Sequence, residues 1–320
     1  MTKTKIWIIV ATLLSVLGIL IFVVAMTLNN WNFGGLSMTK LVTNTHEVNE
    51  KFSDIFISVN TADIEILPSE NEKTRVICTE EVKLLHSVSV NNGVLEISVK
   101  DTRQWYDHIS LFSFENSKII LYLPEGEYGR LKVRGSTGDL FAAKNFTFSG
   151  VDALLSTGDT RLLCSAKELI EIEADTGDIT IEDVSAGELA LTVSTGDIAV
   201  INAAVTQDIE INVSTGEAKL QNTTCKSFSS DGSTGDITLE NLVASEKLEI
   251  ERSTGNIILK SSDAAEVDIE TDTGDVRGSF KTDKIIFAKT NTGRVDVPKS
   301  TSGGRCEIET DTGDIKIEIK

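Results

Sequence analysis

The feature that most constrains this chain is a Thr-Gly pair that recurs at a nearly fixed spacing. Every step between successive copies is nineteen or twenty residues. The glycines are Gly138, Gly158, Gly177, Gly196, Gly216, Gly235, Gly255, Gly274, Gly293 and Gly313. Ser, Asp or Asn precedes each pair and Asp usually follows it, and these residues together with glycine are typical of tight turns. So many copies at one period indicate a repeat architecture in which each Thr-Gly pair is a corner.

Apolar and polar residues alternate on both sides of the corners. Before Gly196, the apolar positions are Leu189, Leu191 and Val193, and Ile198 continues the pattern after it. A period of two is typical of strands with one buried and one solvated side. The sequence therefore predicts an all-β chain, a parallel β-solenoid with two strands in each coil of about 19–20 residues. An antiparallel meander or a propeller is the alternative, but a meander does not explain one residue type at one offset in every copy.

An apolar run without charges covers residues 6–28. As a helix it is about 35 Å long, which is enough to cross a membrane. Lys3 and Lys5 precede it and the next basic residue is Lys40, so the positive-inside rule predicts a cytoplasmic N-terminus at residues 1–5 and an extracytoplasmic remainder. A cleaved signal peptide is the alternative, but the run is longer than a usual signal core and lacks a good cleavage site.

The rest of the chain divides into segments according to how regularly the repeat occurs. We expect a linker at 29–45, irregular N-terminal coils with a cap at 46–130, and the regular solenoid at 131–320. Residues 60–66 and 92–97 look like worn copies of the corner.

An aromatic insertion between residues 101 and 116 includes Trp105, Tyr106 and His108. We expect it to cover the first coil, because an open solenoid end exposes apolar core. A partner contact through Trp105 and Tyr106 is the alternative.

A resemblance supports this interpretation. The strand Ile-Ile-Leu-Tyr-Leu-Pro at residues 119–124, the Ser-Thr-Gly-Asp-Leu at 136–140 and the later Thr-Gly-Asp-Ile copies resemble a family called putative adhesins, a domain of unknown function common in bacterial membrane-anchored proteins. The resemblance covers about residues 46–320. It implies a β-solenoid in a bacterial extracytoplasmic setting, sometimes linked to envelope-stress systems, and it transfers no catalytic residue.

Charge and cysteine content exclude several classes of function. The formal net charge of −19 argues against a nucleic-acid partner or an anionic lipid surface patch. No C-x-x-C pair is present, so neither a zinc knuckle nor a redox motif is expected, and no cofactor is expected. Buried free thiols are predicted for Cys78, Cys164, Cys225 and Cys306.

In stacked coils, the aspartates that follow the corner glycines would form a column. They include Asp139, Asp159, Asp178, Asp197 and Asp236. Neighbouring carboxylates at about 4.8 Å repel by roughly 1 kcal/mol in water, so they need cations or backbone donors. Glu217, Asn256 and Arg294 interrupt the column, and the nonapeptide of known calcium solenoids is absent. We therefore predict turn aspartates bonded to the backbone, with calcium sites as the alternative.

The sequence predicts no catalytic site. His46, His86 and His108 are the only histidines and lie outside the regular repeats, and the plentiful carboxylates do not single out a pair. The leading hypothesis is a non-catalytic, adhesin-like membrane-anchored rod for surface adhesion, scaffolding or envelope-stress signalling. The alternative is a β-solenoid enzyme that acts on polysaccharide.

Residues 315–320 run to the end of the chain as a strand pattern with no cap after it. This predicts an open sheet edge at the C-terminus, with weak homodimers forming through that edge.

Overall fold

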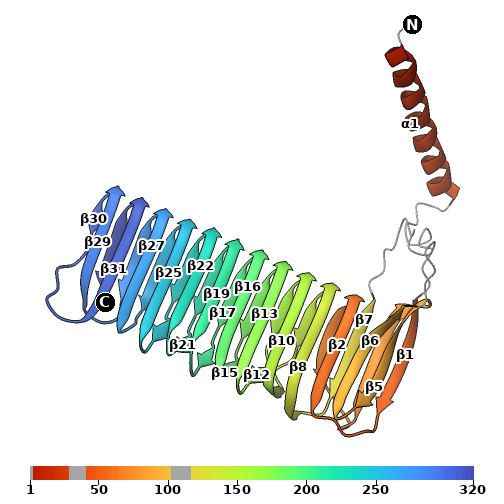
Figure 1. Cartoon of the computed structure of the whole chain (residues 1–320), viewed down its shortest axis with the longest axis horizontal. Coiled ribbons are helices and arrows are strands. Elements are labelled where there is room, and N and C mark those ends of the chain that lie inside the picture. Colours follow the sequence, from red (N-terminus) through yellow and green to blue (C-terminus); the bar gives the residue numbers. More distant parts are fainter. Residues whose placement is uncertain (1–2, 29–40, 102–116) are drawn as a thin grey trace.

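The computed structural model describes residues 3–28, 41–101 and 117–320, which form one helix and a rod of stacked β-coils (Figure 1). Helix α1, Lys3–Leu28, is long and apolar enough to span a membrane. It stands apart from the rod, near the end that carries the first strands. The aromatic residues Trp105 and Tyr106, proposed above as cap or partner contact, and His108 lie outside the described residues.

The strands that precede the corners pair in parallel and, together with β6, form one face of the rod, which we call face A. In spatial order they are β6 (Val94–Asp101), β2 (Asp54–Thr61), β8 (Gly126–Thr137), β10 (Phe146–Thr157), β13 (Leu169–Thr176), β16 (Glu188–Thr195), β19 (Ile209–Thr215), β22 (Phe228–Thr234), β25 (Lys247–Thr254), β27 (Glu266–Thr273), β31 (Gly304–Thr312) and β29 (Lys284–Thr292).

The strands that follow the corners, together with β7, form the other face, face B. They are β7 (Lys118–Leu123), β3 (Asp63–Pro68), β9 (Leu140–Ala142), β11 (Thr160–Leu162), β14 (Ile179–Glu182), β17 (Ile198–Ile201), β20 (Ala218–Gln221), β23 (Ile237–Glu240), β26 (Ile257–Ser262), β28 (Val276–Phe280), β32 (Ile315–Ile319) and β30 (Val295–Asp296).

The register of these strands stacks equivalent apolar residues inside the rod. Ile170 lies beside Leu189, and Leu189 lies beside Ile209, and all three are fully buried. Burying one such side chain is worth about 1.5–3 kcal/mol. The same contact repeats in coil after coil, so one continuous apolar core runs through about ten turns. The predicted parallel β-solenoid is confirmed.

A third side, missed by the prediction of two strands per coil, closes each turn. Its two-residue strands are β12 (Ser165–Ala166), β15 (Ser185–Ala186), β18 (Ala204–Val205), β21 (Thr224–Cys225) and β24 (Val243–Ala244). A second corner leads into it at Asn202, Asn222 and Asn241, which have positive φ of 54°, 52° and 55°. Their side-chain amides bond from coil to coil at 3.0 and 3.1 Å. Asn tolerates this left-handed conformation better than most residues.

Three antiparallel strands cap the N-terminal end: β1 (Leu41–Val48), β4 (Thr74–Glu81) and β5 (Leu84–Asn91). Strand β4 pairs with both β1 and β7, and β5 pairs with β6. The predicted linker at residues 29–45 is wrong at its far end, because β1 already begins at Leu41.

Of the two worn corners, only the first is a corner. Thr61 pairs in register with Thr137, so residues 60–66 turn as the later copies do. Asn92 and Gly93 instead form a two-residue hairpin turn between β5 and β6, with φ of 51° and 80°. Asn-Gly is the preferred pair for such a hairpin, so the interpretation of residues 92–97 as a corner is wrong.

The coil order at the C-terminal end departs from the sequence order. Strand β31 lies between β27 and β29, and β32 lies between β28 and β30 (Figure 1). The chain therefore builds the outermost coil first and then returns to fill the position inside it. The open edge predicted at residues 315–320 is wrong: Ile317 is only 3 % exposed, whereas Phe287 of the outer coil is 57 % exposed.

Candidate functional site: the corner column, the two faces and the cap

Close backbone packing explains why glycine occupies every Thr-Gly corner. A Cβ atom on Gly196 would lie 2.1 Å from the carbonyl oxygen of Gly177 in the next coil. Across all the corner glycines the corresponding distance is 1.9–2.2 Å, far inside van der Waals contact. The φ of Gly196 is also 144°, a backbone angle that residues other than glycine rarely adopt.

The corner aspartates bond to the backbone of the neighbouring coil. The backbone N–H of Asp159 donates to Oδ1 of Asp139 at 2.8 Å, and Asp178 donates in the same way to Asp159 at 2.9 Å. The ladder continues through Asp197, whose Oδ1 accepts the N–H of Glu217 at 2.7 Å. These bonds supply the donors that stacked carboxylates need, because hydrogen bonds to the ionised form stabilise it.

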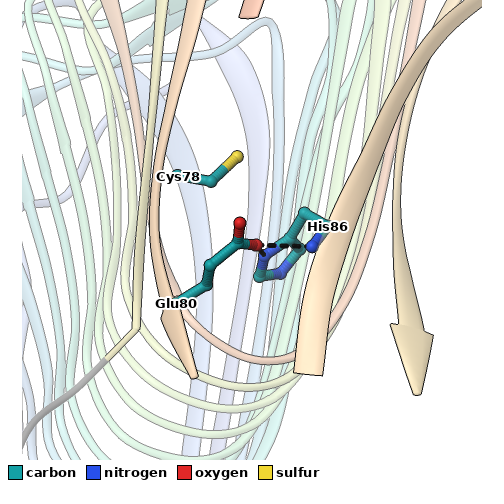
Figure 2. A group of neighbouring side chains, drawn as sticks. All are labelled: Cys78, Glu80 and His86. Atoms are coloured by element: carbon teal, nitrogen blue, oxygen red, sulfur yellow. Dashed lines mark hydrogen bonds and ion pairs between the residues drawn. The ribbon is translucent and has the colours of Figure 1, made fainter. Parts of the chain in front are cut away.

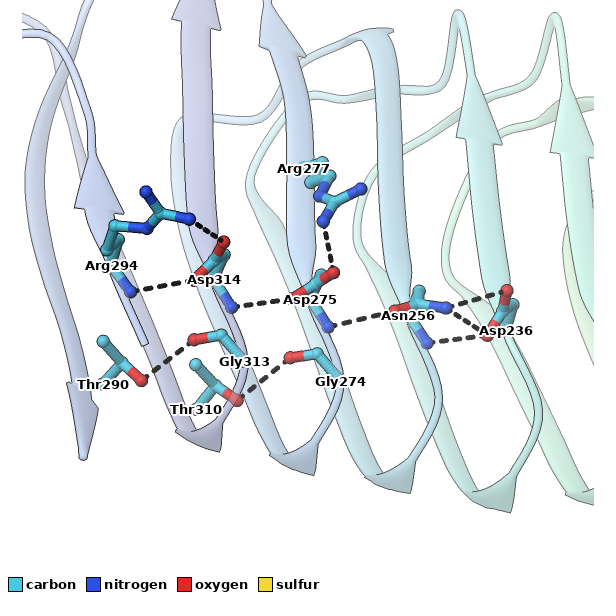
Figure 3. Close-up of polar contacts among 10 residues, drawn as sticks. All are labelled: Asp236, Asn256, Gly274, Asp275, Arg277, Thr290, Arg294, Thr310, Gly313 and Asp314. Atoms are coloured by element: carbon cyan, nitrogen blue, oxygen red, sulfur yellow. Dashed lines mark hydrogen bonds and ion pairs between the residues drawn. The ribbon is translucent and has the colours of Figure 1, made fainter. Parts of the chain in front are cut away.

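Figure 3 shows how the column ends. Asp236, Asn256, Asp275, Asp314 and Arg294 follow one another in space, and each one after Asp236 donates its N–H to the side chain before it. Arg294 is the outermost member, and its guanidinium lies 3.9 Å from the carboxylate of Asp314. Arginine interrupts the aspartates here because no described coil lies beyond it to need an acceptor. Thr290 and Thr310 add hydroxyl bonds to the glycine carbonyls of the adjacent coil.

Face A carries a dense acidic surface near its C-terminal end. In-register pairing places Glu249, Asp268 and Glu307 side by side on β25, β27 and β31. A second row in the same strands consists of Glu251, Glu270 and Glu309. Lys247 and Lys289 form partly exposed ion pairs at the margins, and the hydrogen bond from Lys247 to Glu249 raises the pKa of Lys247. The acidic positions predicted to face water thus gather on one side of the rod.

Face B differs in charge at the same end of the rod. A shallow groove of about 300 Å³ crosses β26, β28 and β32, and its lining includes Lys260, Arg277, Lys316 and Lys320, together with Glu318. Carboxylates partner three of these basic side chains, in the pairs Lys260–Glu240, Arg277–Asp275 and Lys316–Glu318. Face B is therefore more balanced in charge than the acidic face A.

The cap contains a buried polar cluster between β4 and β5, formed by Cys78, Glu80 and His86 (Figure 2). Cys78 and Glu80 are fully buried and His86 is 6 % exposed. One carboxylate oxygen of Glu80 lies 2.7 Å from Nδ1 of His86 and also accepts the His86 backbone N–H. The other accepts the amide of Asn44 at 2.6 Å. Burial, with a smaller contribution from the charge of Glu80, raises the pKa of the Cys78 thiol to about 12.

Sequence reasoning missed this cluster. It treated Cys78 as a buried thiol, which the structure confirms for all four cysteines, but did not connect it with other residues. The available signal was the alternation of Cys78 and Glu80, which puts both side chains on one face of a strand. The position of His86 opposite them depends on how β4 and β5 fold together.

The architecture places the chain among the parallel β-solenoids, with an apolar helix at its N-terminus. A family model described as Toastrack DUF4097 matches residues 52–207 and 201–320, and the chain belongs to this family. The match confirms the resemblance noted from the strand at residues 119–124 and the corners after it.

Several solved structures are similar to the chain. A putative adhesin from Parabacteroides distasonis is 12% identical, covers 87% of this chain and 98% of its own, and has a TM-score of 0.48. A putative adhesin from Bacteroides fragilis is 15% identical, with 87% and 97% covered and a TM-score of 0.44. A putative lipid binding protein from Parabacteroides distasonis is 21% identical, with 74% and 94% covered and a TM-score of 0.46. No curated protein matches the chain.

Proposed function

We propose that this protein is a non-catalytic, membrane-anchored rod on the outer side of the cell membrane, where it serves surface adhesion, scaffolding or envelope-stress signalling. The observation that carries the proposal is the combination of one 26-residue apolar helix with an uninterrupted solenoid. Ten coils at about 4.8 Å extend for about 50 Å. Such a rod suits the presentation of a surface at a distance from the bilayer.

The acidic surface of face A indicates the chemistry of a partner. The rows of carboxylates on β25, β27 and β31 would attract a cationic protein surface and repel anionic wall polymers. Binding through such a face should weaken as salt is added, because exposed charges are screened within about 8–10 Å at physiological ionic strength. Glu251→Lys with Glu270→Lys reverses the centre of this surface without touching the core, so it should abolish capture of a partner cross-linked on intact cells.

Topology can be tested through the cysteines. All four native cysteines are buried. On intact cells, a membrane-impermeant maleimide should therefore label this protein only where an exposed cysteine has been introduced. Lys144 is exposed in a turn of the rod, and we expect Lys144→Cys to be labelled on intact protoplasts. The matched control is Thr4→Cys, ahead of the apolar run, which should react only after lysis. Labelling of Thr4→Cys but not Lys144→Cys on intact cells would contradict the proposed orientation.

The enzyme alternative requires paired carboxylates across a cleft. The groove on face B is lined by four basic side chains, with Glu318 as the carboxylate in its lining. Incubating the full chain with cell-wall glycans and analysing the products would separate the two functions, and we expect no cleavage.

A further inference from the structure

The polar cluster in the cap is unusual for its position, because it lies in the apolar interior between β4 and β5. Cys78, Glu80 and His86 are all at least nine-tenths buried. Buried polar groups are costly unless they are bonded, and a buried carboxylate is especially costly. A feature of this kind in a small cap therefore calls for a stabilising partner or a function.

The donor atoms of the three residues already lie close together. The sulfur of Cys78, a carboxylate oxygen of Glu80 and a ring nitrogen of His86 are all within 4.8 Å of one another. Ligands of a tetrahedral zinc ion, at about 2.0–2.3 Å from the metal, lie about 3.3–3.8 Å apart. Small side-chain movements are enough to close the cluster around one ion.

A second, independent observation concerns His46 on β1. Its Nε2 atom is buried and has no hydrogen-bond partner among the described residues. His46 lies opposite Val76 and Asn44 lies opposite Cys78, so His46 occupies the position diagonal to Cys78 on the same face of the sheet. Its ring nitrogens are not among the donor atoms that lie within 4.8 Å of one another, so His46 would have to turn towards Cys78 to become a fourth ligand, which diagonal neighbours in antiparallel strands can reach.

The bonds around Glu80 would also suit a metal ligand. The Asn44 amide and the His86 backbone N–H both donate to its carboxylate. Such bonds orient a carboxylate for coordination and persist beside a bound ion. Within the described part of the chain, Glu80 forms an ion pair with His86, and a divalent cation would add positive charge beside this buried carboxylate.

We propose that Cys78, Glu80 and His86 form a binding site for a transition-metal ion of the zinc class, and that His46 turns in to complete it. Sulfur, nitrogen and carboxylate donors together favour Zn²⁺ over Ca²⁺ or Mg²⁺, which prefer oxygen alone. The ion would connect β1, β4 and β5, and so fasten the strand that leads in from the apolar helix to the rest of the cap.

The test uses the metal-free full chain in detergent micelles, with Co²⁺ as a spectroscopic probe. We expect one equivalent of Co²⁺ to produce a thiolate-to-cobalt charge-transfer band, Zn²⁺ to displace it, and Zn²⁺ to raise the melting temperature. Ca²⁺ should leave the melting temperature unchanged, because the corner aspartates are already bonded to backbone. The absence of a thiolate band in the wild-type chain would overturn the proposal.

Variants identify the ligands. Cys78→Ala should remove the thiolate band. The control Cys306→Ala, which changes a buried thiol on β31, far from the cap, should keep it. If Cys78→Ala does not fold by circular dichroism, His86→Gln serves instead and should lower the Co²⁺ affinity at least tenfold. His46→Gln should have a similar effect, and an unchanged affinity would exclude His46. A band that persists in folded Cys78→Ala would overturn the site.

Discussion

Gly196 illustrates how a single residue position sets the spacing of the coils. A Cβ at this position would meet the Gly177 carbonyl oxygen at 2.1 Å, so Gly196→Ala must push two backbones apart or strain φ. We expect a loss of about 2–4 kcal/mol in the free energy of unfolding, measured by urea denaturation. The matched control is Gly150→Ala, whose Cβ would lie 3.4 Å from the nearest atom. Equal losses in the two variants would contradict this account.

Arg252 is an exception to the apolar core. It is 4 % exposed, and Nε and Nη1 have no hydrogen-bond partner among the described residues, although Nη2 donates to Ser230 at 2.8 Å. Burial lowers the pKa of this guanidinium, and Gly232 leaves the room for it. Because an unpaired buried charge is costly, we expect Arg252→Met to raise the free energy of unfolding by about 1–2 kcal/mol. A decrease in denaturant unfolding would show that Arg252 stabilises the coil.

At the level of strands, the exchanged order of the last two coils has a measurable consequence. Ile315 donates its N–H to Arg294 on one side, and Val276 donates to Asp314 on the other. Strand β32 is therefore an inner strand although it ends the chain. In hydrogen exchange followed by mass spectrometry, we expect peptides from Ile315–Ile319 to be as protected as those from β28, and peptides from residues 297–303 to exchange faster. Rapid exchange of β32 would indicate that the coils stack in sequence order.

For the molecule as a whole, buried thiols link stability to alkaline pH. Burial raises the pKa of Cys164, Cys225 and Cys306 from 9.0 to about 12. The unfolded chain loses these protons above about pH 9 while the folded chain keeps them. The stability contribution is therefore complete below pH 9 and is lost as the pH rises towards 12.

Urea unfolding of the full chain between pH 7 and 11 tests this link. We expect the wild-type free energy of unfolding to fall above pH 9, and Cys164→Ala to fall less steeply, by up to about 1.4 kcal/mol per pH unit. Parallel curves for the two proteins would contradict the link.

The outermost coil presents a strand edge that could pair with a second rod. Strand β29 has β31 on one side and no described strand on the other, and Phe287 on it is 57 % exposed. Exposed strand edges promote pairing unless charge or twist prevents it. We therefore expect weak, concentration-dependent association in sedimentation that Phe287→Lys reduces. Ile317→Lys should instead destabilise the fold, because Ile317 is buried. Unchanged association of Phe287→Lys would exclude this edge.

The sequence by itself determined the repeating part of the fold. Gly177 and Gly196, nineteen residues apart, stack directly because a residue at one offset in a parallel solenoid meets its own counterpart in the next coil. Periodicity is therefore enough to predict the corners, the buried side of each strand and the aspartate column. The second corner could have been predicted in the same way, because its asparagines, Asn202, Asn222 and Asn241, also recur every nineteen or twenty residues.

Only the tertiary structure decided the two ends. Parallel in-register pairing stabilises any two coils by similar amounts, so no local pattern shows that β32 fits inside β30 rather than beyond it. In the cap, Glu80 and His86 meet locally across the short connection between β4 and β5, whereas His46 reaches the same face of the sheet only through the pairing of β1 with β4. Pairings between non-equivalent strands compete with one another over long sequence separations. Which pairing is the most stable cannot be read from a local sequence pattern.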